Sequence, residues 1–278
     1  MGGEDQGAAM SLPLSEWANS GAGTLGSLEV GAAAALWLVT RPSTLVDTSA
    51  GSIVGGLLAL GKTPSDLYDI VISADYAKLI PINEWLFPIR KYLASNSNVI
   101  AWLKEITDEQ TMADCTIPFT AICSDLNTGM ARTWDSWLLP EMPVWEAILC
   151  SMSIPQVYPA WQGRYMDGGM VDNLGINYLP GKHKRIGLKV TEHTRIGPVV
   201  GLVQQVEREV GMMLGASESD MVLLAKATGV PIIRLRAGCL GFLDTSMTRA
   251  QKIGLYQRGY EAVQAWLESS AGKEWNHG

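Results

Sequence analysis

The fold of this chain is decided by the stretch Leu45-Val46-Asp47-Thr48-Ser49-Ala50-Gly51-Ser52-Ile53-Val54. In it an apolar run, a corner of small residues and a second apolar run follow one another. A strand that enters a helix directly forces a sharp turn, which holds a serine hydroxyl clear of the sheet and directs the helix N-terminus toward charge that forms beside it. The pattern predicts a nucleophile corner around Ser49, with the flanking positions Asp47, Ala50 and Gly51. Asp47 stands where such corners normally have glycine.

A glycine-rich loop precedes this corner, in the segment Ser20-Gly21-Ala22-Gly23-Thr24-Leu25-Gly26, and an apolar run over residues 32–39 follows it. A loop of this kind at the start of a helix directs several backbone N–H groups at one point. That arrangement suits a phosphate or the oxyanion of a tetrahedral intermediate. We therefore expect an anion site at the loop.

The same loop has a second interpretation. Gly21, Gly23 and Gly26 fit the pattern G-x-G-x-x-G, and Asp47 lies where the ribose-binding acid of a dinucleotide-binding enzyme would fall. That alternative needs a buried strand before the loop. Residues 12–19 contain a proline and several polar side chains, so we expect no strand there. We assign residues 1–19 to an N-terminal extension, and residues 1–9 are typical of a tag remnant.

A third group of segments comprises Ser151-Met152-Ser153-Ile154-Pro155 and Tyr165-Met166-Asp167-Gly168-Gly169-Met170-Val171-Asp172-Asn173. With these segments the chain resembles the patatin-like phospholipases. That family has a glycine-rich oxyanion loop, a G-x-S-x-G corner and a later Asp-Gly-Gly or Asp-Gly-Ala, in this order. The resemblance covers residues 20–180 well and residues 232–267 more loosely. It implies an α/β fold, a patatin-like three-layer sandwich with a largely parallel central sheet and helices on both faces.

The resemblance also implies roles for single residues. Ser49 would be the nucleophile and Asp167 its base, since a serine hydroxyl is a poor nucleophile unless a base accepts its proton. The oxyanion hole would be formed by amides around Gly21, Ala22 and Gly23, with supporting glycines at Gly26, Gly168 and Gly169. The implied reaction is hydrolysis of a phospholipid, lysophospholipid or other acyl ester through an acyl-enzyme, of the phospholipase A or lysophospholipase type, without a metal or cofactor.

Histidines are scarce, because the chain has only His183, His193 and His277. His183 lies in a basic loop and His277 lies next to the terminus. His193 follows an expected strand and is the one candidate for a Ser, His, Asp triad. A loop position explains His193 more simply, so we expect a dyad.

Two positions depart from the family pattern. Leu25 replaces the usual lysine or arginine beside the loop, and Asp47 replaces the first glycine of the corner. A carboxylate that pointed toward the oxyanion site would oppose the charge that develops there. The rival hypothesis is therefore a catalytically silent lipid-binding protein with the same fold.

Composition supports one compact α/β domain over residues 20–270, followed by a flexible tail at residues 271–278. The formal charge of −7 and the pI near 5.0 argue against a nucleic-acid partner. The N-terminus lacks the pattern of a signal peptide, and the apolar run at residues 30–39 is too short to cross a bilayer. Four scattered cysteines read as reduced core thiols of a cytosolic protein (Cys115, Cys123, Cys150 and Cys239). We expect a cytoplasmic protein that contacts a membrane or micelle surface peripherally.

Large apolar residues are concentrated between residues 75 and 115, where Pro81 and Pro88 rule out one long helix. This segment interrupts the alternation of strands and helices, as a cap or acyl-binding insertion would. Strands are expected at residues 119–123, 187–190 and 231–235. Helix starts are expected after Thr63 and Thr248.

Overall fold

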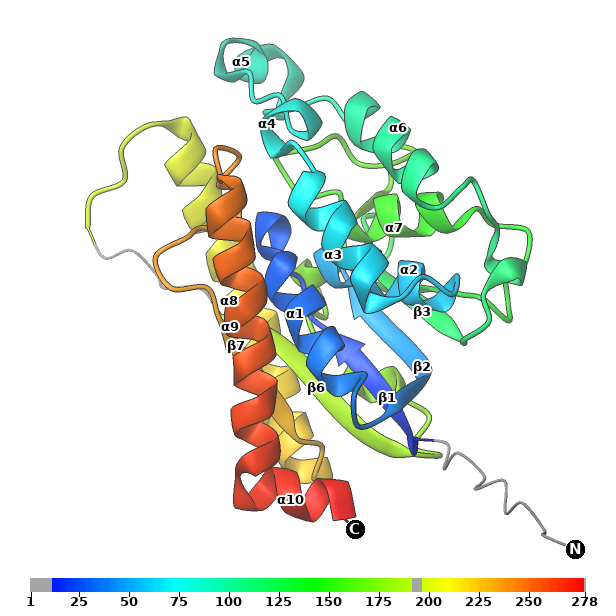
Figure 1. The fold of residues 1–278 in the computed structure, drawn as a ribbon. Helices are drawn as coiled ribbons and strands as arrows, with labels where there is room; N and C mark the ends of the chain where they lie inside the picture. The colour runs from blue at the N-terminus through cyan, green and yellow to red at the C-terminus, as the bar shows by residue number, and fades with distance from the viewer. Residues whose placement is uncertain (1–11, 192–196, 278) are drawn as a thin grey trace, which may run out of the picture.

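The computed structural model describes residues 12–191 and 197–277, in which helices cover both faces of a central sheet of seven strands (Figure 1). The order across the sheet is β4-β3-β2-β1-β6-β7, and β5 pairs with β3. Four pairings are parallel, while β4 and β5 run antiparallel to β3. The strands are β1 (Leu14–Asn19), β2 (Arg41–Thr48), β3 (Phe119–Asp125), β4 (Met130–Asp135), β5 (Tyr165–Asp167), β6 (Lys184–Thr191) and β7 (Ile232–Arg236). The predicted α/β class with a largely parallel sheet is confirmed, as are the three expected strands.

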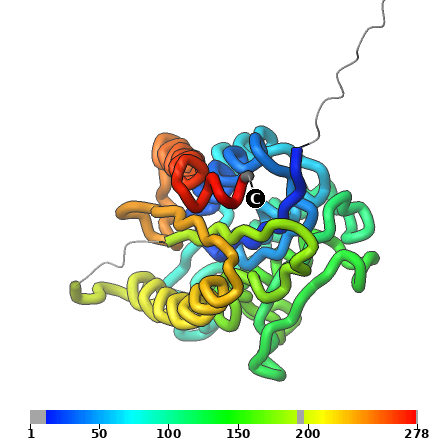
Figure 2. Tube along the Cα trace, turned by 90° about the horizontal axis from the view of Figure 1, so that it is seen from below, coloured from blue at the N-terminus to red at the C-terminus, as the bar shows by residue number. Residues whose placement is uncertain are grey.

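Ten α-helices connect or flank these strands in the described ranges. They are α1 (Ser27–Leu36), α2 (Ala50–Ala59), α3 (Pro64–Ser73), α4 (Tyr76–Leu79), α5 (Phe87–Arg90), α6 (Ser97–Ile106), α7 (Val144–Met152), α8 (Leu202–Thr228), α9 (Arg249–Glu268) and α10 (Ser270–His277). Three short 3-10 turns enter the argument below: η1 (Gly23–Leu25), η2 (Glu84–Leu86) and η4 (Gly168–Met170). Figure 2 shows α1 and α9 on one face of the sheet and α8 on the other.

Strand β1 corrects the expectation that residues 12–19 form no strand. It lies between β2 and β6 in the middle of the sheet. Its polar side chains are buried with partners distant in sequence: Ser15 Oγ lies 2.8 Å from Thr40 Oγ1, and the Glu16 carboxylate accepts the backbone N–H groups of residues 181–183. The N-terminal extension therefore ends before Leu14.

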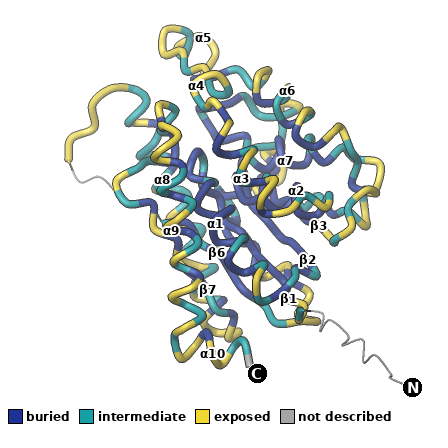
Figure 3. Tube along the Cα trace, in the orientation of Figure 1, coloured by how far each residue is buried: buried dark blue, intermediate teal, exposed yellow. Residues whose placement is uncertain are grey.

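Helix α1 is deeply buried beside the site, with nine of its ten residues buried (Figure 3). It packs against α9 at very close range, because a Cβ at Gly31 would lie 1.9 Å from the Tyr256 carbonyl oxygen. Gly259 approaches the Leu28 carbonyl oxygen equally closely. Helix α1 follows the glycine loop, so this packing fixes the position of the loop.

The helix starts after Thr63 and Thr248 are confirmed, each with a reciprocal capping box. The expected flexible tail is wrong for residues 271–277, because they belong to α10 (Ser270–His277) and Trp275 Nε1 donates to the Arg185 carbonyl oxygen at 3.1 Å. Cys123 and Cys150 are buried, but Cys239 is exposed, so the expectation of four core thiols is wrong there. Among the described helices, none is both long and apolar enough to cross a membrane.

Candidate active site

Ser49 occupies a strained corner between β2 and α2. Its φ of 54° and ψ of −124° lie in a region that residues other than glycine rarely adopt, at a cost of about 1–3 kcal/mol. The Ser49 amide donates to Ser151 Oγ at 2.8 Å, and the Ser151 hydroxyl donates to the Ile122 carbonyl oxygen at 2.5 Å. A Cβ at Gly51 would lie 2.7 Å from the Ser20 carbonyl oxygen, which explains the small residue there. The surrounding contacts thus hold the corner in its strained form.

The Asp167 carboxylate accepts a hydrogen bond from the hydroxyl group of Ser49. Ser49 Oγ donates to Asp167 Oδ2 at 2.6 Å, although the two residues are 118 positions apart in sequence. The Gly169 amide donates to Asp167 Oδ1 at 2.8 Å, and the backbone of Asp167 is fixed by Ser153 and Ser124. Burial raises the pKa of Asp167 to about 6, against the lowering effect of the hydrogen bonds from Ser49 and Gly169. The carboxyl group is therefore a stronger base than an exposed aspartate.

The glycine loop passes directly beside this pair, because a Cβ at Gly21 would lie 3.0 Å from Ser49 Cβ. At Gly23, where φ is 54°, a Cβ would lie 2.2 Å from the Phe242 carbonyl oxygen. The Gly21 amide donates to Asn173 Oδ1 at 3.0 Å, so it is already engaged. Within the described residues no hydrogen bond occupies the amides of Ala22 and Gly23. Two of the three expected anion donors are thus unengaged.

A chain of polar contacts ties the loop to distant elements. Asn173 Nδ2 donates to Glu218 Oε1 of α8 at 2.6 Å, and Glu218 Oε2 lies 2.6 Å from Lys189 Nζ of β6. Asn173 and Ser151 lie within the sequence motifs, but the motifs alone assign them no role, and Glu218 and Lys189 lie outside these motifs. No motif surrounds Glu218, and only the packing of α8 brings it to the site.

Asp47 is a buried residue of β2 whose carboxyl group faces β1 and α2. Its Oδ1 accepts the Asn19 amide at 3.0 Å and Asn19 Nδ2 at 2.6 Å, and its Oδ2 lies against Gly55 of α2. Asp47 lines neither cavity beside Ser49. The strand, glycine loop and helix required by the dinucleotide hypothesis are present, but this buried carboxyl group is not accessible to a ribose.

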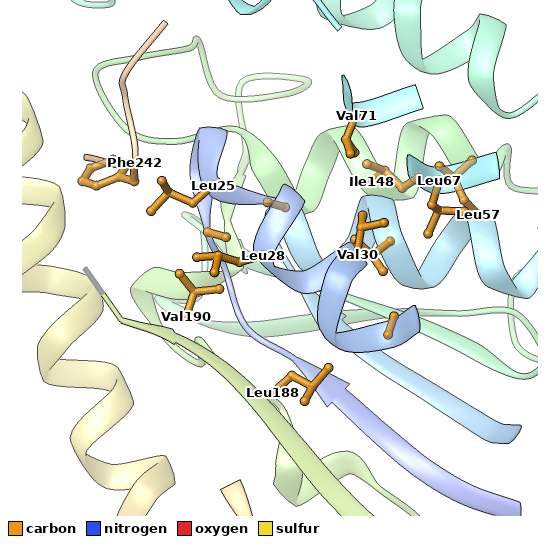
Figure 4. Packing of buried hydrophobic residues seen from close by; sticks show 14 of the residues in the cluster. Leu25, Leu28, Val30, Leu57, Leu67, Val71, Ile148, Leu188, Val190 and Phe242 are labelled. Atoms are coloured by element: carbon orange, nitrogen blue, oxygen red, sulfur yellow. The ribbon is translucent and has the colours of Figure 1, made fainter. Parts of the chain in front are cut away.

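Leu25 is 1% exposed and fills an apolar position. Figure 4 shows it between Phe242, Leu28 and Val190. The place where the family usually has a basic residue is therefore part of the hydrophobic core. Gly26 forms the N-cap of α1 and has open space beside its Cα, whereas Gly168 and Gly169 bring η4 close to β3 and Asn173.

Two cavities meet at Ser49. The first, of about 160 Å³, is lined by the glycine loop, Asp167 and one side of α8, including Val210, Leu214 and Glu218. The second, of about 60 Å³, is lined mostly by apolar side chains. Its lining from the predicted cap at residues 75–115 comprises Tyr76, Leu79, Ile80, Val99 and Trp102. The cap segment therefore forms one wall of an apolar space that reaches the serine.

Within the described part of the chain, no histidine lies beside Ser49. His193 lies outside the described residues. His183 precedes β6 at the opposite end of the parallel sheet from the corner, and His277 ends α10. The contact that the structure shows is the direct one between serine and aspartate.

Comparison with known proteins gives a family match and several similar folds. The family model described as patatin-like phospholipase matches residues 18–180. No curated protein sequence matches this chain significantly. The structure of VipD from Legionella pneumophila is similar, with a TM-score of 0.63 and 13% identity, over 94% of this chain and 67% of VipD. The type III effector protein ExoU of Pseudomonas aeruginosa is similar with a TM-score of 0.50 and 13% identity, over 96% of this chain and 53% of ExoU. The chain thus spans about two thirds of VipD and about half of ExoU, and these likenesses concern the fold.

Proposed function

The chain belongs to the patatin-like phospholipase family, and from this premise we propose that it is a lipid acyl hydrolase with Ser49 as nucleophile and Asp167 as base. The observation that carries the proposal is the hydrogen bond of 2.6 Å from Ser49 Oγ to Asp167 Oδ2 in a strained corner. A buried serine that donates to a carboxylate of raised pKa is prepared to lose its proton as it attacks.

The proposed reaction has two steps. Ser49 Oγ attacks the ester carbonyl carbon while Asp167 accepts its proton, and Asp167 then passes that proton to the departing alcohol oxygen. In the second step a water molecule gives a proton to Asp167 as its oxygen attacks the acyl carbon. Asp167 then passes that proton to Ser49 Oγ as the bond to the acyl group breaks, which releases the fatty acid and restores Ser49 and the carboxylate. The unengaged amides of Ala22 and Gly23 would bind the oxyanion in both steps, each worth about 3 kcal/mol of barrier.

The two cavities suggest how the substrate lies. The apolar cavity beneath the cap fits an acyl chain, since Ile53, Val54 and Trp102 offer only hydrocarbon and aromatic surface. The more polar cavity against α8 would hold the alcohol portion. We therefore assign the substrate to phospholipids, lysophospholipids or simpler acyl esters, met at a peripheral membrane or micelle surface.

The decisive experiment measures intact mass after treatment with an alkyl fluorophosphonate. We expect one adduct on the parent chain, none on Ser49→Ala, and labelling at least about 100-fold slower on Asp167→Asn. Ser43→Ala is the matched control, because Ser43 lies on the same strand and, among the described residues, its hydroxyl donates only to the Ser15 carbonyl oxygen. Hydrolysis of a soluble short-chain ester should follow the same order among the variants.

A folded parent chain that forms no adduct would contradict the proposal and favour the catalytically silent lipid-binding hypothesis. In that case Asp47→Gly, which restores the usual glycine of the corner, tests whether position 47 causes the silence, and labelling of this variant would show that it does. If Asp47→Gly also remains unlabelled, the departure at position 47 is not the cause of the silence.

A further inference from the structure

We propose that the tip formed by η2 and α5, residues 84–91, docks the protein onto a membrane surface containing anionic phospholipid. The tip carries the most exposed large apolar side chains of the described residues: Trp85 is 93% exposed and Ile89 is 80% exposed. They lie four residues apart on consecutive helical turns. Tryptophan at the end of a projecting segment is typical of side chains that settle at the level of lipid headgroups.

The charge of the tip is opposite to that of the chain. Arg90 and Lys91 are exposed and take part in no ion pair among the described residues, while Glu84 is the one acid between residues 84 and 91. Two bases and one acid give this segment a net charge of +1, whereas the whole chain carries −7. An anionic surface would therefore attract the tip and repel most of the remaining molecule, which orients the approach.

The tip is firmly connected to the walls of both cavities. The Asn83 amide donates to the Leu93 carbonyl oxygen at 2.7 Å, which closes the base of the loop. The Leu93 and Ala94 amides then donate to the carbonyl oxygens of Gln156 and Val157, at 2.7 and 2.8 Å. The neighbours of these two carbonyl groups, with Val157 itself, line the cavities beside Ser49: Ile154, Pro155, Val157 and Tyr158. A docked tip would therefore hold the site at a fixed position relative to the lipid surface.

A second apolar group lies toward the same end of the molecule. Val200 is 73% exposed and Val199 is 46% exposed, immediately before α8. Figure 1 shows the start of α8 and the α5 tip at the same end. Helix α8 forms one wall of the larger cavity, so this second apolar group is also connected to the site.

This docking proposal rests on the proposed hydrolase function, but the test of docking does not depend on catalysis. The full chain with Ser49→Ala would be mixed with phosphatidylcholine vesicles with or without phosphatidylserine, and binding measured by flotation. Adding Trp85→Ala and Ile89→Ala should weaken binding to both vesicle types roughly tenfold or more. Adding Arg90→Gln and Lys91→Gln should weaken binding only to the anionic vesicles, by a similar factor, and should reduce its dependence on salt.

Trp137→Ala is the matched control, because Trp137 is 57% exposed but follows the edge strand β4. We expect its vesicle binding to equal that of the parent. In chains that retain Ser49, the tip variants should hydrolyse a soluble short-chain ester at the parent rate, because the tip is not part of the site. Docking by the tip is overturned if the parent binds neither vesicle type, or if the tip variants bind as the parent does. Loss of the fluorophosphonate adduct with vesicle binding intact would instead overturn the hydrolase alone.

Discussion

Asp167 gives the candidate site a pH dependence whose direction follows from its burial. Only the ionised carboxylate can accept the serine proton, and burial raises the pKa of Asp167 to about 6. We therefore expect the rate of soluble-ester hydrolysis to rise between pH 5 and pH 7, with half of the maximum near pH 6. Initial rates measured in buffers of constant ionic strength test this, with Asp167→Asn expected to be inactive throughout. A flat profile from pH 5 to pH 8 in an active enzyme would exclude Asp167 as the base.

Asp47 affects stability rather than the serine directly. Burial raises its pKa well above the ordinary range, although the hydrogen bonds from Asn19 act against this shift. The neighbouring buried Glu29 shifts in the same direction, because it is also desolvated and is repelled by Asp47. The fold thus favours the protonated form of Asp47, and this contribution to stability is lost as the pH rises through the raised pKa.

Substitution of Asp47 by asparagine tests this balance. Asp47→Asn keeps an oxygen that can accept from Asn19 but cannot ionise. We expect it to match the parent only below about pH 4, where aspartate is protonated in the unfolded chain too. At pH 8 it should exceed the Tm of the parent by at least about 2 °C, or about 1 kcal/mol for a domain of this size. Thermal melts across this pH range measure the difference, and Asp69→Asn on the exposed side of α3 is the control. A lower Tm for Asp47→Asn at pH 8 would mean that the carboxylate stabilises the fold.

At the scale of elements, the close contact between α1 and α9 sets the position of the glycine loop. In Gly31→Ala the new methyl group would lie 1.9 Å from the Tyr256 carbonyl oxygen, so the helices must separate. We expect a loss of about 1–3 kcal/mol in the free energy of unfolding, measured by urea denaturation. Gly254→Ala on α9 is the control, because nothing lies within 4 Å of its added Cβ. It should be neutral or stabilising by up to about 1 kcal/mol. Equal effects of the two substitutions would show that this contact is not tight.

The features that could be predicted from the sequence are those that depend on neighbouring residues in the chain. The corner at Ser49, the caps at Thr63 and Thr248 and the strand at β3 follow from patterns within about ten residues. Strand β1 could not be predicted in this way. Its Ser15 and Glu16 would normally mark an exposed or irregular segment, yet their partners are Thr40 and the amides of residues 181–183. A polar residue in a central strand is recognisable only when its distant partner is known.

The candidate site likewise has parts that sequence motifs could predict and parts that they could not. The order of the glycine loop, serine and Asp-Gly-Gly motifs predicted which residues would meet, and the structure brings Ser49 and Asp167 together. The engagement of the Gly21 amide by Asn173 depends on a side chain 152 positions away. Glu218 joins this network from the middle of α8, where no sequence pattern distinguishes it from an exposed acid.

At the scale of the whole molecule, the two sides of the larger cavity differ in how firmly they are held. Nine of ten residues are buried in each of α1 and α2, whereas only Val206, Val210 and Ala225 are buried among the 27 residues of α8. Elements with few buried contacts open locally at lower free energy than the core. Helix α8 covers the opposite face of the sheet from α1, as Figure 2 shows, and it is the wall that could move to admit a lipid.

Hydrogen exchange followed by mass spectrometry measures this difference. We expect the amides of α8 to exchange at least roughly tenfold faster than those of α1 and α2 in the parent chain. A fluorophosphonate that carries a long alkoxy chain would, once attached to Ser49, place that chain in the cavity assigned to the alcohol portion. There it would contact Val210 and Leu214, which line this cavity, and should slow exchange in α8 more than in α1. The Ser49→Ala chain exposed to the same reagent is the control and should exchange as the untreated parent does. Protection of α8 equal to that of α1 before labelling would show that this wall is rigid and that lipid enters from the cap side, past Trp102 and Ile80.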